Sequence, residues 1–316
     1  MKRITKVLVL ILSILLVTGC TQTLVNKDNQ RVINENTGQN LTANILCLPK
    51  DETLLNKYNE NKETIASNSK YKTNLDNLVP CDEMGAWKNP YDGIWVQLFV
   101  QPLSWLIIKT GELVGNIGIS VMIIGILIRL VLLPFTIKST KQQEIMKKIQ
   151  PELDRLEKKY AGKDDQDSMM KKSQETMMIY KKYNMNPLSS CLVMLIQLPI
   201  FFAFLEAINR TPAIFENSLW QFQLGTTPLY GITHGNYWYI LLLVLIILFT
   251  ILTFMQSMGS MNGNSESQKQ SKMMMYMMIV FIGIASFQLP SAIALYWVIT
   301  NAFSVVQTLI IKKVGK

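Results

Sequence analysis

Residues 113–135 read LVGNIGISVMIIGILIRLVLLPF, an apolar run with one charged side chain, Arg129. A helix of about 20 apolar residues crosses the hydrocarbon core of a bilayer, so this run predicts a transmembrane helix. A charged side chain inside such a helix costs roughly 2.5–3.5 kcal/mol on insertion scales. Arg129 therefore indicates a bundle interior, a hydrated cavity or a functional site.

Helical phase favours an inward direction for Arg129. At about 100° per residue, one stripe of the helix carries small residues together with the arginine. Its members are Gly111, Gly118, Gly125, Arg129 and Thr136. Small residues at this spacing let helices approach closely, so the stripe should face other helices. The alternative is snorkelling, in which the long stem of Arg129 carries its guanidinium to the headgroups.

The composition indicates a polytopic membrane protein. The chain has 316 residues, 49% of them hydrophobic, a mean hydropathy of +0.21 and a formal net charge of +9. Its lysines cluster beside apolar runs, which fits membrane topology better than sequence-specific nucleic-acid binding. The single histidine, His234, and the absence of metal-spaced, phosphate-loop or nucleophile motifs predict neither an enzyme nor a cofactor.

The N-terminus has the pattern of a bacterial lipoprotein signal. Basic residues Lys2, Arg3 and Lys6 precede an apolar run that ends in LVTGC at positions 16–20. This pattern predicts a signal peptide at 1–19 and lipidation, of the palmitate type, on Cys20. An uncleaved anchor helix is the alternative.

Residues 20–91 are rich in Asn, Lys and Thr. They predict an extracytoplasmic, lipid-anchored tether that is partly disordered, with some helix over 50–74. Cys47 and Cys81 can pair in an oxidising compartment or stay free.

The rest of the chain predicts an all-α fold. Residues 92–136 should form an interfacial helix, over 94–109, and the first transmembrane helix. A cytoplasmic helical hairpin is expected at 137–186, with its turn at 161–165, and four further transmembrane helices are expected within 187–311. The five spans are placed at 113–135, 188–207, 237–255, 273–289 and 291–311.

Lysine and arginine bias sets the expected orientation. The segment 137–186 holds twelve Lys or Arg residues, and the tail 312–316 is basic, whereas the loop 209–236 has only Arg210. A cell-membrane protein with its lipid-anchored N-terminus outside and its C-terminus in the cytoplasm follows. Glu206 and Arg210 predict a local ion pair worth a few tenths of a kcal/mol.

Polar residues in three spans predict a hydrated groove. Gln197 falls at mid-membrane, and Trp297, Asn301 and Ser304 share one face of the last span. Ordinary interhelical hydrogen bonds, worth about 0.6 kcal/mol each, are the alternative for any one of them. Together with Arg129, they are the candidate substrate-binding residues.

Several motifs then resemble one family. They are QPEL at 150–153, YNMNPLSSCL at 183–192, QLPIF at 197–201, LP at 289–290, LYW at 295–297, Asn301 with Gln307, and Arg129 with Pro134. This order is similar to the YidC/Oxa/Alb family of membrane protein insertases, in its Gram-positive lipoprotein form, over residues 92–313. Val193, Ser190 and Ala292 depart from the family pattern by small changes in helix packing.

The resemblance implies an insertase and chaperone with a groove open to the cytoplasm and to lipid. Its expected partners are nascent membrane proteins, the ribosome, the Sec translocon and the bilayer. A small-solute transporter or channel subunit would also explain a charged residue in a polar cavity. A lipid-anchored scaffold is a third reading, although it leaves the cost of Arg129 unexplained.

Overall fold

The computed structural model describes residues 21–68, 71, 73–87, 93–163, 165–185, 187–258 and 266–314. The described residues are mostly helical, at 70%, and the chain divides into two compact units. The first unit comprises Met1–Gly125, Leu198–Leu243 and Ser286–Trp297, and the second comprises Ile126–Gln197, Val244–Ala285 and Val298–Lys316. Cys20 and the signal segment lie outside the described residues.

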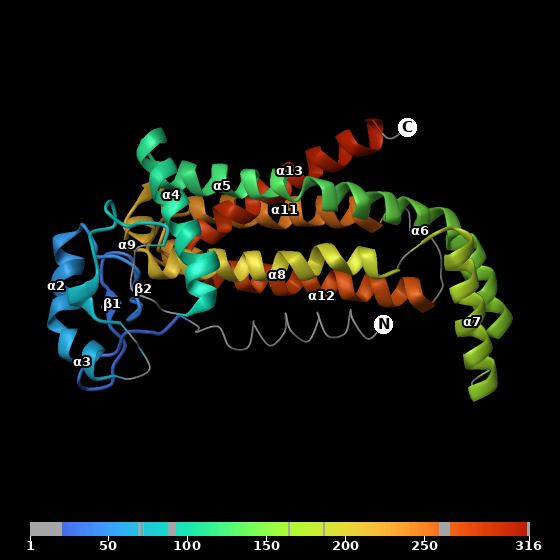
Figure 1. Cartoon of the computed structure of the whole chain (residues 1–316), viewed down its shortest axis with the longest axis horizontal. Coiled ribbons are helices and arrows are strands. Elements are labelled where there is room, and N and C mark those ends of the chain that lie inside the picture. The colour runs from blue at the N-terminus through green and yellow to red at the C-terminus, as the bar shows by residue number, and fades with distance from the viewer. Residues whose placement is uncertain are drawn as a thin grey trace. The chain divides into compact units, whose positions relative to one another are not determined.

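The first unit begins with a small folded region, residues 21–87, called here the N-terminal domain (Figure 1). Strands β1 (Ile33–Asn34) and β2 (Gln39–Asn40) pair in antiparallel fashion. Helices α2 (Glu52–Glu60) and α3 (Lys62–Ser67) and the short 3-10 helix η1 (Leu75–Asn77) follow. Asp51 begins α2, because its carboxylate accepts the Leu54 N–H at 2.9 Å and satisfies a helix-end donor.

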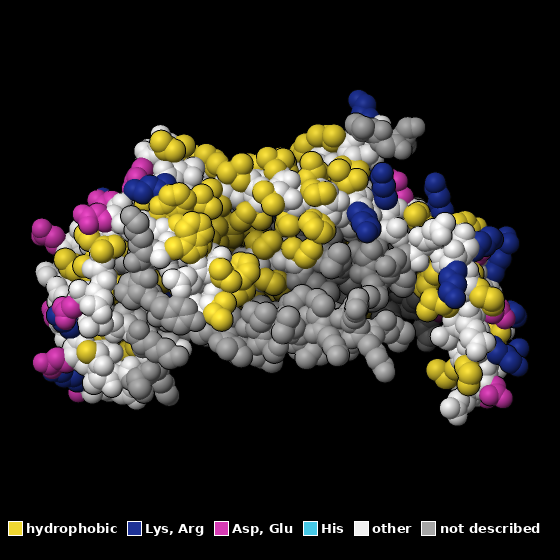
Figure 2. Space-filling model, in the orientation of Figure 1, with side chains coloured by type: hydrophobic (Ala, Val, Ile, Leu, Met, Phe, Trp, Pro, Cys, Tyr) yellow, Lys and Arg dark blue, Asp and Glu magenta, His cyan; other side chains and the backbone are white. Residues whose placement is uncertain are grey.

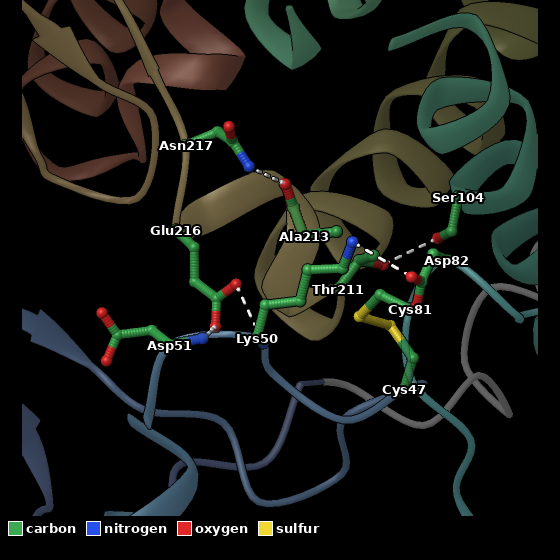
Figure 3. The surroundings of a disulfide bond; sticks show 10 residues. All are labelled: Cys47, Lys50, Asp51, Cys81, Asp82, Ser104, Thr211, Ala213, Glu216 and Asn217. Carbon is green, nitrogen blue, oxygen red and sulfur yellow. Dashed lines mark hydrogen bonds and ion pairs between the residues drawn. A yellow bond between two sulfur atoms is a disulfide. The ribbon is translucent and has the colours of Figure 1, made fainter. Parts of the chain in front are cut away.

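This domain corrects the expectation of a partly disordered tether. Its apolar side chains have no sequence period, yet they converge into one core. The core consists of Leu24, Leu41, Ala43, Ile45, Leu54, Tyr58, Ile65, Tyr71, Leu75 and Phe215. Cys47 and Cys81, both buried, form a disulfide within the same domain (Figure 3). The helix expected within 50–74 is confirmed by α2 and α3.

In the region of the predicted first span, 113–135, the observed helix is shorter than the apolar run. A helical segment of π type, η2 (Val96–Val100), leads into α4 (Gln101–Val114), which ends at Gly115 with a φ of +75°. Asn116 then accepts the Ile119 N–H at 3.0 Å and begins α5 (Ile117–Val131). Glycine is favoured at a left-handed helix end, and asparagine at a helix start, so residues 115–116 form a break between helices.

The remaining elements alternate long helices with short connections. From the N-terminal side they are α6 (Leu133–Tyr160), α7 (Gln166–Lys182), α8 (Pro187–Arg210), α9 (Pro212–Phe215), β3 (Ser218–Leu219), β4 (Phe222–Gln223), α10 (Pro228–Thr233), α11 (Trp238–Met258), α12 (Glu266–Gln288) and α13 (Ser291–Val314). Strands β3 and β4 form an antiparallel hairpin. Helices α6 and α7 lie side by side (Figure 1).

Among the described residues, two helices are long and apolar enough to cross a membrane, Trp238–Gln256 and Ser291–Lys313. The bent pair Ile117–Val131 and Leu133–Tyr160, with an angle of 62°, adds a third. Helix α12 contributes a shorter apolar stretch, Met275–Gln288, because its first half is polar. Multiple membrane crossings are thus supported, and the count of five remains a prediction.

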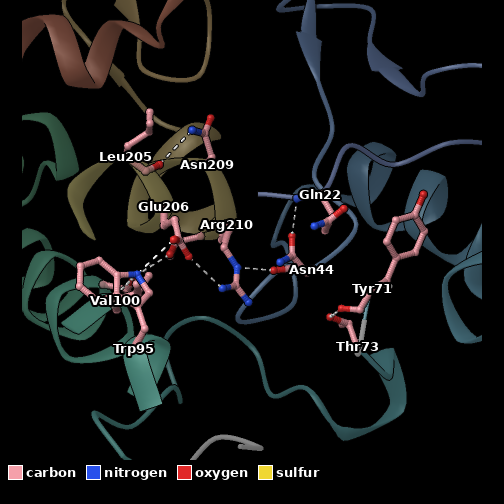
Figure 4. A network of polar contacts seen from close by, with 12 residues as sticks. Gln22, Asn44, Tyr71, Thr73, Trp95, Val100, Leu205, Glu206, Asn209 and Arg210 are labelled. Carbon is pink, nitrogen blue, oxygen red and sulfur yellow. Dashed lines mark hydrogen bonds and ion pairs between the residues drawn. The ribbon is translucent and has the colours of Figure 1, made fainter. Parts of the chain in front are cut away.

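The ion pair between Glu206 and Arg210 is buried, contrary to the expectation of a weak local pair. The Arg210 Nη1 atom lies 3.3 Å from Glu206 Oε2, and the two side chains are 1% and 8% exposed. Trp95 donates its indole N–H to Glu206 at 3.1 Å, and Arg210 donates its Nε–H to the Asn44 carbonyl at 2.6 Å (Figure 4). Leu46 N–H in turn donates to the Arg210 carbonyl at 2.8 Å.

This network ties together the N-terminal domain, the helix that leads into α4, and the end of α8. Each of its charged groups has an opposite charge and at least one further hydrogen bond. Removing one partner from a buried pair typically costs about 3–5 kcal/mol, since the remaining charge is left without compensation.

We therefore expect Arg210→Met to destabilise the first unit by about 3 kcal/mol or more, measured by unfolding in detergent. The double variant with Glu206→Gln should recover part of that loss, because it removes the stranded carboxylate. Lys27→Met is the matched control, since Lys27 and Glu63 form an exposed pair with side chains 70% and 84% exposed. Equal destabilisation by Arg210→Met and Lys27→Met would show that burial of the pair has no energetic role.

Candidate functional site

Helix α5 places Arg129 at the end of a buried stripe of small residues. Gly118 and Gly125 are buried, as is Gly111 in α4. A Cβ atom added at Gly118 would lie 2.6 Å from Leu219 Cβ, so a larger residue there would displace the β3–β4 hairpin. The burial of Gly118 and Gly125 agrees with the predicted packing stripe within α5, whereas Gly111 lies in α4, before the helix break at residues 115–116. Arg129 is partly buried, whereas Leu130 and Val131 beside it are 45% and 74% exposed.

Helix α13 carries the polar face that the sequence predicted. Thr300 and Ser304 are 1% and 8% exposed, and Asn301 is partly buried. The Asn301 side chain donates from Nδ2 to Thr250 Oγ1 of α11 at 3.2 Å. This contact is an interhelical hydrogen bond, the alternative that the sequence left open for each of these residues.

Gln307 shows that such bonds do not satisfy the whole polar face. Its side chain is 5% exposed, and neither its amide oxygen nor its amide nitrogen has a hydrogen-bond partner among the described residues. A buried polar group left unpaired costs about 1–3 kcal/mol. Water or a bound polypeptide segment can supply the missing partner, so this part of α13 is suited to a polar ligand.

The other candidate residues are distributed over both units. Gln197 lies in α8, partly buried, within the second unit that also holds Arg129, Asn301 and Ser304. Trp297 belongs to the first unit, where its ring stacks on Phe201 with centroids 5.5 Å apart and an interplanar angle of 9°. The lipidation candidate Cys20 lies outside the described residues.

Sequence reasoning missed Thr250 as the partner of Asn301. The available signal was a single hydroxyl in the otherwise apolar stretch of residues 241–252. Such a residue in a membrane helix tends to hydrogen-bond across a helix interface. Among the described residues there is no group of three or more His, Cys, Asp or Glu side chains that could hold a metal ion.

Helices α6 and α7 form the most charged part of the second unit. Two ion pairs connect them, Lys159 to Glu175 at 2.7 Å and Lys182 to Glu152 at 2.9 Å. The Tyr160 hydroxyl donates a hydrogen bond to the Glu175 carboxylate. Hydrogen bonding by Lys159 and then by Tyr160 holds the pKa of Glu175 below its usual value.

The remaining charges leave this hairpin basic. Residues 137–186 contain twelve Lys or Arg against eight Asp or Glu. Figure 2 shows dark blue Lys and Arg side chains on α6 and α7 with yellow hydrophobic ones between them. The hairpin is therefore both cationic and partly apolar.

Methionine side chains of α7 supply the apolar surface of the hairpin. Met169, Met170, Met177 and Met178 of α7 are each more than half exposed, at 51–63%. By contrast, one side of α7 is partly covered. Its residues are spaced by four, three and four positions and are Ser168, Lys172, Glu175 and Ile179. Flexible methionine side chains can fit varied apolar partners.

Comparison with known proteins shows the family to which the chain is similar. The family model described as 60Kd inner membrane protein matches residues 109–316. The chain is 41% identical to "Membrane protein insertase YidC" of Oceanobacillus iheyensis, over 75% of this chain and 91% of that protein. It is 39% identical to "Membrane protein insertase MisCA" of Bacillus subtilis, over 69% of this chain and 79% of that protein.

A solved structure supports the fold. The structure titled "Active YidC insertase crystal structure with the first transmembrane domain resolved" aligns with a TM-score of 0.50 at 22% identity, covering 82% of this chain and 53% of that chain. The family model spans the helices from the end of α4 onward, including Arg129 and the α6–α7 hairpin. From these matches, the chain belongs to the 60Kd inner membrane protein family, the family of the YidC insertases.

Proposed function

We propose that this protein inserts newly made membrane proteins into the cell membrane and helps them to fold. The observation that carries the proposal is Arg129, a cation in an apolar helix that follows directly on a buried stripe of small residues. A charge inside a membrane is costly in free energy, so its presence there indicates a function. The printed names of the relatives, which describe membrane protein insertases, supply the class of function.

The proposed arrangement has five membrane spans. The N-terminal domain lies outside, held to the membrane by lipid on Cys20, and the α6–α7 hairpin and the tail 312–316 lie in the cytoplasm. Positive charge concentrated in the hairpin supports this orientation. Residues 137–186 are then available to the ribosome, and the spans are available to the Sec translocon.

The proposed mechanism needs neither a cofactor nor a catalytic residue. The basic, methionine-rich hairpin first contacts the hydrophobic segment of a nascent client. Arg129, with Gln197, Trp297, Asn301 and Ser304, lines a hydrated groove and attracts acidic groups of the client's translocated tail. The apolar segment then moves sideways into lipid, driven by the burial of its apolar surface.

The orientation can be tested by cysteine labelling in intact cells. Gln174 of α7 and Asn217 before β3 are both exposed, so either position should accept a reporter without repacking. A membrane-impermeant maleimide should label Asn217→Cys and should label Gln174→Cys only after the membrane is opened. The parent protein without an added cysteine sets the background. Labelling of both positions from the same side would contradict the five-span arrangement.

Client capture by α7 can be tested with paired variants. Changing Met169, Met170, Met177 and Met178 to Ser should weaken crosslinking of the hairpin to a nascent apolar segment, because the exposed apolar surface is lost. The matched control changes Lys171 alone to Gln, which should have little effect since single surface charges contribute little. Unchanged crosslinking in the Met variant would mean that this face does not contact clients.

The role of Arg129 can be tested with matched clients in vesicles. Arg129→Ala should reduce insertion of a client with an acidic translocated tail at least about tenfold, equal to about 1.4 kcal/mol. Arg129→Lys should retain much of the activity, because attraction to a carboxylate depends on charge more than on guanidinium shape. Insertion of a client without tail carboxylates should change less.

The stability of each Arg129 variant has to be measured in parallel, since loss of a partly buried charge can repack the helices. If both clients lose insertion equally in a stable Arg129→Ala protein, charge attraction is not the mechanism. The insertase function could still hold in that case, with Arg129 hydrating the groove.

A further inference from the structure

The turn of the β3–β4 hairpin exposes a tryptophan in an unfavourable backbone conformation. Trp220 is 63% exposed, and its φ of 54° lies in the left-handed region that bulky residues disfavour. The turn is nevertheless held in place, because Asn236 donates its side-chain N–H to the Gln221 carbonyl at 2.8 Å. A large apolar ring is thus fixed at the tip of a hairpin where a smaller residue would suit the backbone better.

Trp220 is part of an aromatic cluster made of Trp220, Phe222, Trp238 and Tyr239. Its ring centroid lies 4.4 Å from that of Trp238 and 5.9 Å from that of Phe222, in edge-to-face geometry. Phe222 continues the series to Tyr239 at 5.3 Å. The Gln223 N–H donates to the Tyr239 hydroxyl at 3.0 Å, which fixes the cluster to the start of α11.

The cluster lies in a part of the chain that has no charged side chain. Residues 217–265 contain no Asp, Glu, Lys or Arg. The cluster is also continuous with α11, whose early exposed side chains are apolar, including Ile240, Leu241 and Val244 at 44–53% exposure. Helix α11 is one of the two described helices that are long and apolar enough to cross a membrane.

We infer that the aromatic cluster binds the lipid–water interface, with Trp220 and Trp238 at the level of the headgroups. Indole rings prefer this interface, because they combine an apolar body with an N–H that can stay hydrated. A protein partner is usually met by a surface with a polar rim, and this stretch offers no Asp, Glu, Lys or Arg for such a rim. The cluster would set the depth of the β3–β4 hairpin in the membrane.

Tryptophan fluorescence of the full-length protein in vesicles tests the inference. The vesicles contain phosphatidylcholine and phosphatidylglycerol, with or without lipids brominated on the acyl chain close to the headgroup. Trp220→Phe should remove a component of the emission that brominated lipid quenches and aqueous iodide does not. Trp87→Phe is the matched control, since Trp87 is similarly exposed, at 65%, but is near Asp82, Glu83 and Lys88 in the sequence.

The emission lost in Trp87→Phe should be quenched by iodide. Trp238→Phe gives a second, independent reading of the same cluster if Trp220→Phe does not fold, and it too should remove lipid-quenched emission. The opposite result is that iodide quenches the emission lost in Trp220→Phe and Trp238→Phe as strongly as it quenches the emission of Trp87. In that case the aromatic cluster lies in water and the inference is wrong. Insertion activity is not part of the readout, so this result is independent of the proposed function.

Discussion

The constraint on which this structure depends is that a bilayer core offers no water to backbone N–H and C=O groups. A chain that crosses it must satisfy those groups internally, and helices do so within one segment. The long apolar helices α11 and α13 follow from this requirement. Strands are confined to two short hairpins, β1–β2 and β3–β4, in the part of the chain that the structure describes. The remaining free-energy cost of crossing the membrane comes from buried polar side chains.

Two buried polar sites differ in how completely they are hydrogen-bonded. In the first unit, Glu206 and Arg210 are paired and are also bonded to Trp95 and Asn44, so the network is rigid. In the second unit, Gln307 is buried with neither amide atom bonded among the described residues. A fully bonded network specifies one arrangement, whereas an incomplete one can accept water or a passing segment.

Local patterns predicted much of the helical structure. The glycine stripe of α5, the turn between α6 and α7, and the polar face of α13 all follow from residues a few positions apart. Sequence patterns were less informative where distant segments meet. Phe215 completes the core that begins at Leu24, and Cys47 bonds to Cys81, pairings that no local period encodes. Burial of Arg210 depends in the same way on Asn44, which lies far from it in sequence.

The presence of Phe215 in the core of the N-terminal domain has a consequence for biogenesis. The ribosome makes residues 21–87 before residue 215, so this domain lacks part of its core until residue 215 has been synthesised. Residues 21–87 must therefore wait, with apolar side chains uncovered, while the helices between them and residue 215 are still being made. Completion of this core thus depends on α9, the short helix that directly follows α8.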